Sequence, residues 1–115
     1  MAQQITLFQR NLDMPIQGKK YRFTRENVDN SPDEAGVYAL FDGDELIYYG
    51  RAMGTSETIR SRLQSHYAGR SSPCTQRATH YMRMPTSSPS TSERQLLEEF
   101  KRIHGKLPRC NERLP

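Results

Sequence analysis

The stretch GVYALFDGDELIYYGRA, from Gly36 to Ala52, decides the fold that we expect of this chain. It contains two short runs of mainly apolar and aromatic residues, with the dipeptide Asp42-Gly43 between them. Asp-Gly between two such runs is among the strongest local indications of a β-hairpin, because both residues tolerate the backbone angles of a tight turn. The stretch therefore predicts two antiparallel strands joined by a short turn.

Both strands of this predicted hairpin place tyrosine beside glycine. Side chains alternate along a strand, so Val37 and Ala39 share one face and Tyr38 and Leu40 share the other. With a three-residue turn, Tyr38 pairs with Tyr48 across the two strands. An aromatic pair of this kind stabilises a hairpin without any further role. The neighbouring glycines, however, leave space for a ligand or for another backbone, so both interpretations stay open.

Length and composition indicate a single globular domain. The chain has 115 residues, of which 34% are hydrophobic and 26% are charged. We expect no membrane helix, because a span needs about 18 or more consecutive apolar residues, and the start of the chain lacks the layout of a secretion signal. Cys74 and Cys110 form no metal-binding spacing. We interpret both as reduced thiols in a cytoplasmic protein.

Charge is divided unevenly along the chain. Residues 1–50 contain five Lys and Arg against eight Asp and Glu, whereas residues 51–115 contain twelve against five. A basic half in a small domain is typical of proteins that bind a polyanion, and it is equally compatible with a solvated basic surface.

Together with the hairpin, the helix and strand patterns in the rest of the sequence predict an α+β fold, in which a small three-stranded antiparallel sheet is flanked by helices. We expect helices at about residues 56–67 and 92–104, the second ending at Gly105. The alternating segment ATHYMRM, residues 78–84, suits a third strand. A short strand also fits KKYRFTRENV, residues 19–28, upstream of the hairpin.

Three side chains on the predicted helices invite a chemical interpretation. Arg62 and His66 lie one turn apart beside the apolar stripe of the first helix, where a shared anion such as phosphate would stabilise both. An arginine at the edge of a buried face also has the simpler role of extending its charge to solvent. Glu93 projects near the centre of the apolar stripe of the second helix, where a carboxylate needs a partner or a metal. In the first turn of a helix, an exposed acid is equally usual.

Taken in order, these motifs resemble the GIY-YIG nuclease family. GVY, nine residues and YYG are similar to the signature of that family. IRSRLQSHY resembles its first helix, with the arginine at Arg62, and SERQLLEEF followed by LPRCN resembles its later helix and asparagine ending. The resemblance covers residues 36–111. It departs from the family at Tyr49, which replaces an aliphatic residue, and in the long interval from Glu93 to Asn111.

The resemblance implies an endonuclease that hydrolyses DNA phosphodiester bonds with one divalent ion, Mg²⁺ or Mn²⁺. Tyr38 would be the general base or a relay to one, its pKa lowered by Arg62, which would also bind the scissile phosphate. Tyr48 would hydrogen-bond the phosphate or a metal-bound water, and His66 would orient Tyr38 or share the proton transfer. Glu93 would be the only protein ligand of the metal.

Other residues receive supporting roles from the same resemblance. Glu99 is the alternative metal ligand, because it shortens the interval to Asn111. Gly36, Gly50 and Asn111 would be structural residues at the site. The basic residues expected to contact DNA phosphates are Arg51, Arg60, Arg70, Arg77 and Lys106.

The implied organisation is an N-terminal extension, residues 1–35, packing on a nuclease-like catalytic domain, residues 36–115. The expected partner is DNA, including branched or damaged DNA, with no membrane involved; a monomer and a homodimer are equally compatible with the sequence. The alternative function is a catalytically inactive nucleic-acid-binding module of the same fold. A scaffold protein that binds no nucleic acid is a third hypothesis.

Overall fold

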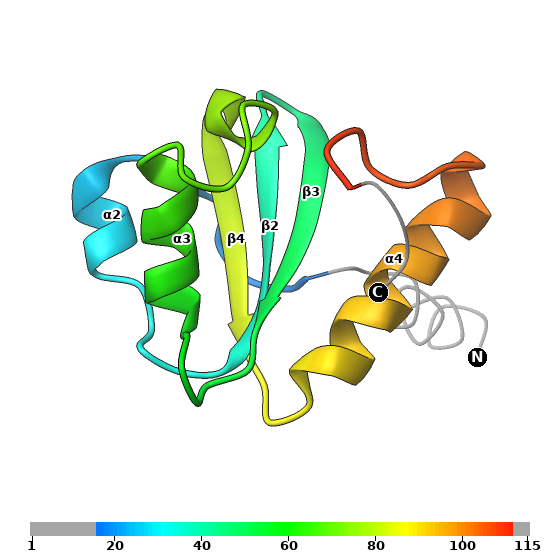
Figure 1. Ribbon diagram of the computed structural model, residues 1–115. Helices are drawn as coiled ribbons and strands as arrows, with labels where there is room; N and C mark the ends of the chain where they lie inside the picture. Colours follow the sequence, from blue (N-terminus) through cyan, green and yellow to red (C-terminus); the bar gives the residue numbers. More distant parts are fainter. Residues whose placement is uncertain (1–15, 112–115) are drawn as a thin grey trace, which may run out of the picture.

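A computed structural model describes residues 16–111 of the chain (Figure 1). Its elements in chain order are β1 (Tyr21–Arg22), α2 (Arg25–Asp29), β2 (Gly36–Asp42), β3 (Glu45–Ala52), α3 (Ile59–Tyr67), the 3₁₀ turn η1 (Thr75–Arg77), β4 (His80–Pro85) and α4 (Pro89–His104). The α+β class is confirmed. The sheet has four antiparallel strands in the order β1-β4-β2-β3 rather than the expected three, because the short β1 pairs with β4.

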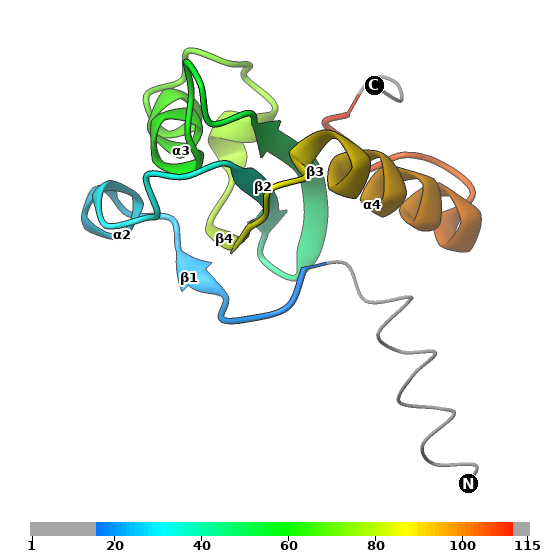
Figure 2. The ribbon, with the colours of Figure 1, turned by 90° about the horizontal axis from the view of Figure 1, so that it is seen from below.

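Helices cover both faces of the sheet (Figures 1 and 2). On the face of α2 and α3, one core includes Tyr38 and Leu40 of β2 together with Leu63 of α3. On the face of α4, a second core includes Val37 and Ala39. The predicted alternation of β2 is therefore confirmed, and the central strand is buried on both faces.

The β2–β3 hairpin closes with a shorter turn than expected. Asp42 pairs with Glu45, so the turn contains two residues, and its Gly43 has a φ of 64°. Between Phe41 and Leu40 the pairing of β2 with β3 shifts by one residue, because Ile47 of β3 has no partner in β2. Such a β-bulge bends the strand and changes the pairing beyond it.

The bulge and the shorter turn change the partners of the two tyrosines. Tyr38 lies opposite Gly50, and Tyr48 lies opposite Leu40, so the expected direct pairing of the two tyrosines is wrong. Beyond the bulge the shift amounts to two residues, which leaves Tyr38 and Tyr48 on the same face because the side-chain period of a strand is two. The two rings consequently remain neighbours, with their centroids 6.2 Å apart.

Local capping explains where the helices begin and end. α3 begins later than expected, after Thr58, whose side chain and that of Ser61 form a reciprocal capping box. α4 begins earlier, with Pro89 as its first residue, where the missing N–H of proline has no penalty. It ends as expected at Gly105, which adopts the left-handed conformation with a φ of 78°.

Two large apolar residues that continue the buried stripes of α3 and α4 by helical spacing are nevertheless exposed. Tyr67 is 40% exposed and Ile103 is 51% exposed. Both lie in the last turn of their helix, beyond the part that packs on the sheet. His66 is almost fully buried, at 1% exposure, next to Tyr67.

β1 and β3 are the edge strands of the sheet, and each edge is partly covered. β1 pairs with β4 through Tyr21 and Arg22. At the opposite edge, the N–H of Cys110 donates a hydrogen bond to the carbonyl of Ile47 in β3. Covering an edge in this way prevents unwanted strand pairing. Residues 1–15 of the expected N-terminal extension lie outside the described residues, whereas residues 16–35 include β1 and α2.

Within residues 16–111, no helix combines the length and apolar character required to cross a membrane.

Candidate functional site

A polar pocket of about 550 Å³ opens beside the outer strand, β3. Arg62, His66 and Ser65 reach it from α3, whereas Glu93 reaches it from α4, on the other side of the sheet. The other lining residues are Tyr48, Arg70, Ser71, Ser72, Thr75, Leu97, Cys110 and Asn111. The pocket therefore gathers four of the five residues that the sequence singled out for catalysis.

Tyr38, the fifth, lies behind the pocket wall and is connected to it through His66. Its side chain is fully buried, and its hydroxyl lies 2.9 Å from Nε2 of His66. The other ring nitrogen of His66, Nδ1, lies 3.0 Å from the hydroxyl of Thr75. These contacts make a continuous chain of hydrogen bonds from β2 through α3 to η1.

The ring of Tyr38 occupies the space above Gly50. A Cβ atom at Gly50 would overlap Cζ and the hydroxyl oxygen of Tyr38, so only glycine fits opposite this tyrosine. Gly36 is similarly crowded by the carbonyl of Met84 and by the side chain of Ile59. The space beside both glycines is thus filled by the protein itself, which corrects the expectation that it would admit a ligand.

Burial keeps the two tyrosines protonated. It raises the pKa of Tyr38 above the ordinary value for a phenol, and the charge of Arg62 only partly opposes this effect. Burial likewise raises the pKa of Tyr48 despite the same arginine. Arg62 acts on the pKa of Tyr38 in the expected downward direction, but the net shift is upward, because desolvation outweighs the attraction of the phenolate to one guanidinium.

His66 is held in its neutral form. Burial, assisted by the positive charge of Arg62, lowers the pKa of His66 to about 4. A neutral imidazole has one nitrogen that donates a hydrogen bond and one that accepts. Near neutral pH, His66 therefore offers one lone pair as a hydrogen-bond acceptor, whereas its lowered pKa disfavours the imidazolium.

Arg62 is the principal cation of the pocket. Its closest carboxylate is that of Glu57, with Nη1 and Oε2 4.0 Å apart. Its Nε is buried and has no hydrogen-bond partner within residues 16–111. A partly buried guanidinium with an unused donor is suited to receive an anion in the pocket.

Glu93 has the inward orientation expected of it, at 8% exposure. Its Oε1 accepts a hydrogen bond from Nη1 of Arg51 at 2.9 Å. Burial raises the pKa of Glu93, although Arg51 and Arg62 oppose that shift. The alternative, Glu99, pairs instead with Arg102 on α4 and does not line the pocket.

Glu93 approaches from the opposite face of the sheet to Arg62 and His66, so these residues do not converge on a single sheet face. The groups meet around the edge of β3 because the C-terminal end of that strand is not covered by another strand. Arg51 and Glu93 belong to the side of α4, and Tyr48 belongs to the side of α3.

The pocket offers limited means of holding a metal ion. No group of three or more His, Cys, Asp or Glu side chains suited to a metal occurs within residues 16–111. Glu93 is the only carboxylate among the described residues that line the pocket. Mg²⁺ commonly binds proteins through one or two carboxylates and retains several waters. The residues therefore fit a site with one carboxylate ligand, provided that Arg51 releases Glu93.

The other basic residues expected to bind DNA are dispersed. Only Arg70 lines the pocket. Nε of Arg60 donates a hydrogen bond to the carbonyl of Ser31 and so has a structural role. Arg77 lies in η1, and Lys106 follows α4; both are exposed outside the pocket lining.

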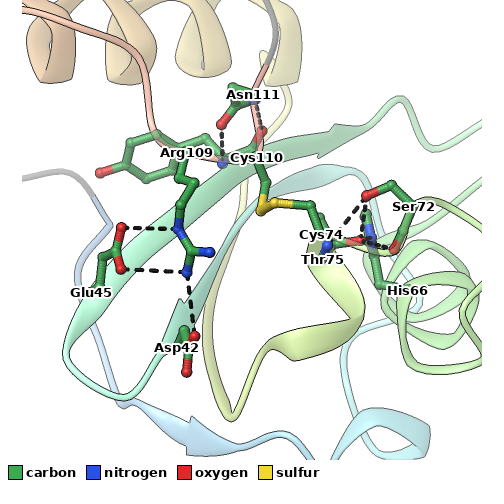
Figure 3. The surroundings of a disulfide bond; sticks show 10 residues. Asp42, Glu45, His66, Ser72, Cys74, Thr75, Arg109, Cys110 and Asn111 are labelled. Carbon is green, nitrogen blue, oxygen red and sulfur yellow. Dashed lines mark hydrogen bonds and ion pairs between the residues drawn. A yellow bond between two sulfur atoms is a disulfide. The ribbon is translucent and has the colours of Figure 1, made fainter.

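Cys74 and Cys110 form a disulfide bond, which corrects the interpretation of both as free thiols (Figure 3). Their Cα atoms are 5.7 Å apart although the residues are separated by 36 positions. The fold brings η1 beside the chain that follows α4, a proximity that spacing alone does not reveal. Disulfides persist mainly in oxidising compartments, so the argument for a cytoplasmic location loses its basis.

The disulfide belongs to a C-terminal clamp, which we define as Arg109, Cys110 and Asn111. Arg109 forms ion pairs with Asp42 and Glu45 at the hairpin turn (Figure 3). Asn111 accepts a hydrogen bond from the N–H of Tyr49 and donates one to its carbonyl. The clamp thus fastens the chain after α4 along β3 and forms one wall of the pocket.

Sequence reasoning missed Ser72, Thr75 and the disulfide as parts of the site. Ser72 and Thr75 lie in the segment SSPCT, which has no periodic pattern. Thr75 contacts His66 of the preceding helix, and Ser72 contacts Thr75. The short helix α2, capped by Thr24, was also missed.

In comparisons with protein-family models and with curated proteins, the chain matches none.

Proposed function

We propose that this protein is an endonuclease that hydrolyses DNA phosphodiester bonds and is related to the GIY-YIG nucleases. The observation that carries the proposal is the gathering of Tyr48, Arg62, His66 and Glu93 around one polar pocket, with Tyr38 bonded to His66 behind it. These residues are far apart in the sequence, yet their side chains together provide an anion site, a proton-accepting group and a carboxylate.

Arg62 and Tyr48 would bind the scissile phosphate. The guanidinium neutralises charge that develops on the phosphoryl oxygens, and its buried unpaired Nε supports this role. The hydroxyl of Tyr48 remains protonated because burial raises its pKa, so it donates a hydrogen bond to a phosphate oxygen.

Proton transfer would use Tyr38 as a relay rather than as a phenolate base. In this step the pocket wall would open toward the hydroxyl of Tyr38, which is fully buried in the free protein. The attacking water would give a proton to that hydroxyl while the hydroxyl gives its own proton to Nε2 of His66. The 2.9 Å contact between these two groups supports this arrangement. Because burial and Arg62 lower the pKa of His66 to about 4, the imidazolium would be a transient species.

Glu93 would hold one Mg²⁺ or Mn²⁺ ion after separating from Arg51. When bound, the ion would supply Lewis-acid stabilisation at the leaving oxygen. Arg51, once released from Glu93, would be free to contact a DNA phosphate beside the pocket, as Arg70 would at its mouth.

The test is cleavage of branched, nicked and plasmid DNA in the presence of Mg²⁺ or Mn²⁺. Arg62→Ala should lower the cleavage rate by about 100-fold or more, as expected for loss of a charge that stabilises the transition state. Glu93→Gln should abolish cleavage. Glu99→Gln is the matched control on the same helix and should leave the rate unchanged.

The catalytically inactive nucleic-acid-binding module is the second candidate, and the Arg51–Glu93 ion pair favours it. In such a module, the arginine would permanently satisfy the buried carboxylate and no metal would bind. Salt-sensitive DNA binding without cleavage of any substrate, together with no Mn²⁺ binding in a paramagnetic-resonance titration, would establish this function and overturn the nuclease proposal. Failure to bind DNA or RNA even at low salt would favour the scaffold.

A further inference from the structure

We propose that Thr75 is a positioning residue that orients His66, so that Nε2 of His66 accepts the hydrogen bond of Tyr38. The catalytic consequence rests on the proposed nuclease function, whereas the positioning itself does not. The inference starts from the only chain of hydrogen bonds that joins Tyr38 to η1 within residues 16–111: Tyr38 hydroxyl, His66 ring, Thr75 hydroxyl.

The direction in which hydrogen bonds are donated along this chain follows from the contacts of its last member, Thr75. Oγ1 of Thr75 lies 3.2 Å from the carbonyl oxygen of Ser72, which can only accept a hydrogen bond. In the proposed chain the single proton of the threonine hydroxyl is used there, and the hydroxyl of Ser72, also 3.2 Å from Oγ1, donates to Thr75. Its oxygen is then left as an acceptor toward Nδ1 of His66 at 3.0 Å.

The tautomer of His66 follows from this direction. If Nδ1 donates to Thr75, a neutral imidazole carries its hydrogen on Nδ1 and leaves a lone pair on Nε2. That lone pair faces the hydroxyl of Tyr38, which then acts as the donor. A reversed chain, with Thr75 donating to Nδ1, would leave the carbonyl of Ser72 with only the N–H of Gln76, 3.3 Å away, as a donor, and would make Tyr38 an acceptor.

Thr75 is itself held firmly. It is 1% exposed, and its N–H donates to the side chain of Ser72 at 3.2 Å. The preceding residue, Cys74, is joined to the clamp through the disulfide. A buried hydroxyl fixed from both sides is suited to orient an imidazole ring.

The other groups that face His66 do not compete for Nδ1. Tyr48 packs its ring edge-on against the imidazole, with centroids 5.1 Å apart. Arg62 lies on the same helix, and its charge disfavours the imidazolium. Glu93 borders the same pocket and is paired with Arg51.

The experiment measures the tautomer of His66 by ¹⁵N–¹H correlation NMR and uses the full chain with its disulfide intact. The parent protein should carry the hydrogen on Nδ1. Thr75→Ser, which retains the hydroxyl, should do the same. Thr75→Val, which retains the shape but removes the hydroxyl, should shift the hydrogen toward Nε2. A parent protein with the hydrogen on Nε2, or a Thr75→Val variant that keeps it on Nδ1, would overturn the proposal.

Two further measurements allow the proposal to be tested even if one variant fails to fold. If Thr75→Val does not fold, the tautomer of the parent protein and of Thr75→Ser still decides the direction of the chain. If DNA is cleaved, Thr75→Val should lower kcat by about tenfold or more with KM little changed, and Thr75→Ser should restore the rate. Absence of cleavage in the parent protein would count against the nuclease function alone, because the NMR result does not depend on it.

Discussion

The side chain of Asn111 pairs with both backbone groups of Tyr49, its Oδ1 lying 2.9 Å from the N–H and its Nδ2 lying 3.0 Å from the carbonyl oxygen. One carboxamide thus replaces the neighbouring strand that the outer edge of β3 lacks at this point. The same asparagine lines the pocket, so edge protection and pocket shape depend on one side chain.

Replacing Asn111 should weaken the fold in a manner that depends on both hydrogen bonds. Asn111→Ala should lower the free energy of unfolding by about 1–3 kcal/mol, because two partly buried backbone groups lose their partners. Asn111→Asp retains the acceptor but loses the donor, and it places a carboxylate against a carbonyl, so it should also destabilise. Urea denaturation checks both values. An Asn111→Asp variant as stable as the parent protein would show that the donor makes no contribution.

Removing the disulfide should have a larger effect. The double variant Cys74→Ala/Cys110→Ala should lose about 2–4 kcal/mol of unfolding free energy, since the bond closes a long loop of the unfolded chain. Thiol titration of the denatured protein checks the premise: no free thiol before reduction and two after it. Two reactive thiols in the unreduced protein would contradict the bond. The stability of the reduced protein also tells whether the fold persists in a reducing compartment.

Local features of the fold were predictable from short segments. The hairpin, the alternation of β2 and the end of α4 at Gly105 depend on neighbouring residues, and each was correctly predicted. The register was not, because the bulge at Ile47 leaves no mark in the alternation of apolar residues. The start of α4 was missed because Pro89 follows a run of serines that reads equally well as a turn.

Only the site residues that belong to sequence motifs were predictable. The inward orientation of Glu93 followed from helical periodicity, but its partner Arg51 lies 42 positions away on another element. The disulfide and the contact of Thr75 with His66 arise from the packing of η1 against α3 and against the clamp. Such contacts between distant segments depend on the three-dimensional arrangement and have no local pattern.

The stability of the protein should depend on pH through His66. Its pKa is lowered to about 4 in the folded state, whereas an exposed histidine has a pKa of about 6.5. As the pH falls, the unfolded chain therefore binds the extra proton before the folded chain does. The contribution of His66 to the free energy of unfolding is fully present above about pH 6.5 and is lost as the pH drops toward 4. This single group accounts for roughly 3 kcal/mol of the loss.

His66→Gln isolates that contribution, because glutamine does not titrate. Urea denaturation at pH 7 and pH 5 should show a smaller loss of stability on acidification for the variant than for the parent protein. Acidic residues titrate in both proteins, so only the difference between the two curves is interpreted. Identical pH dependence would mean that His66 is not held neutral in the folded state.

Gly50→Ala should destabilise the protein by about 1–3 kcal/mol, as expected for overpacking of a buried site. The new methyl group would collide with the ring of Tyr38, which is held in place by its hydrogen bond to His66. Gly36→Ala should cost more, because its Cβ would meet the backbone of β4 as well as the side chain of Ile59, and the backbone cannot move aside easily. Thermal or urea denaturation of both variants gives the ranking, and a Gly50→Ala variant within about half a kcal/mol of the parent would contradict the packing.

The clamp also has a consequence for biosynthesis. Cys110 follows Cys74 by 36 residues, so a growing chain completes the hairpin, α3, β4 and α4 before the partner of Cys74 exists. Throughout that interval the thiol of Cys74 is available to other thiols, and the outer edge of β3 has neither Cys110 nor Asn111 beside it. The pocket is thus the last part of the molecule to be assembled, and the nascent domain is most exposed to mispaired disulfides just before it is finished.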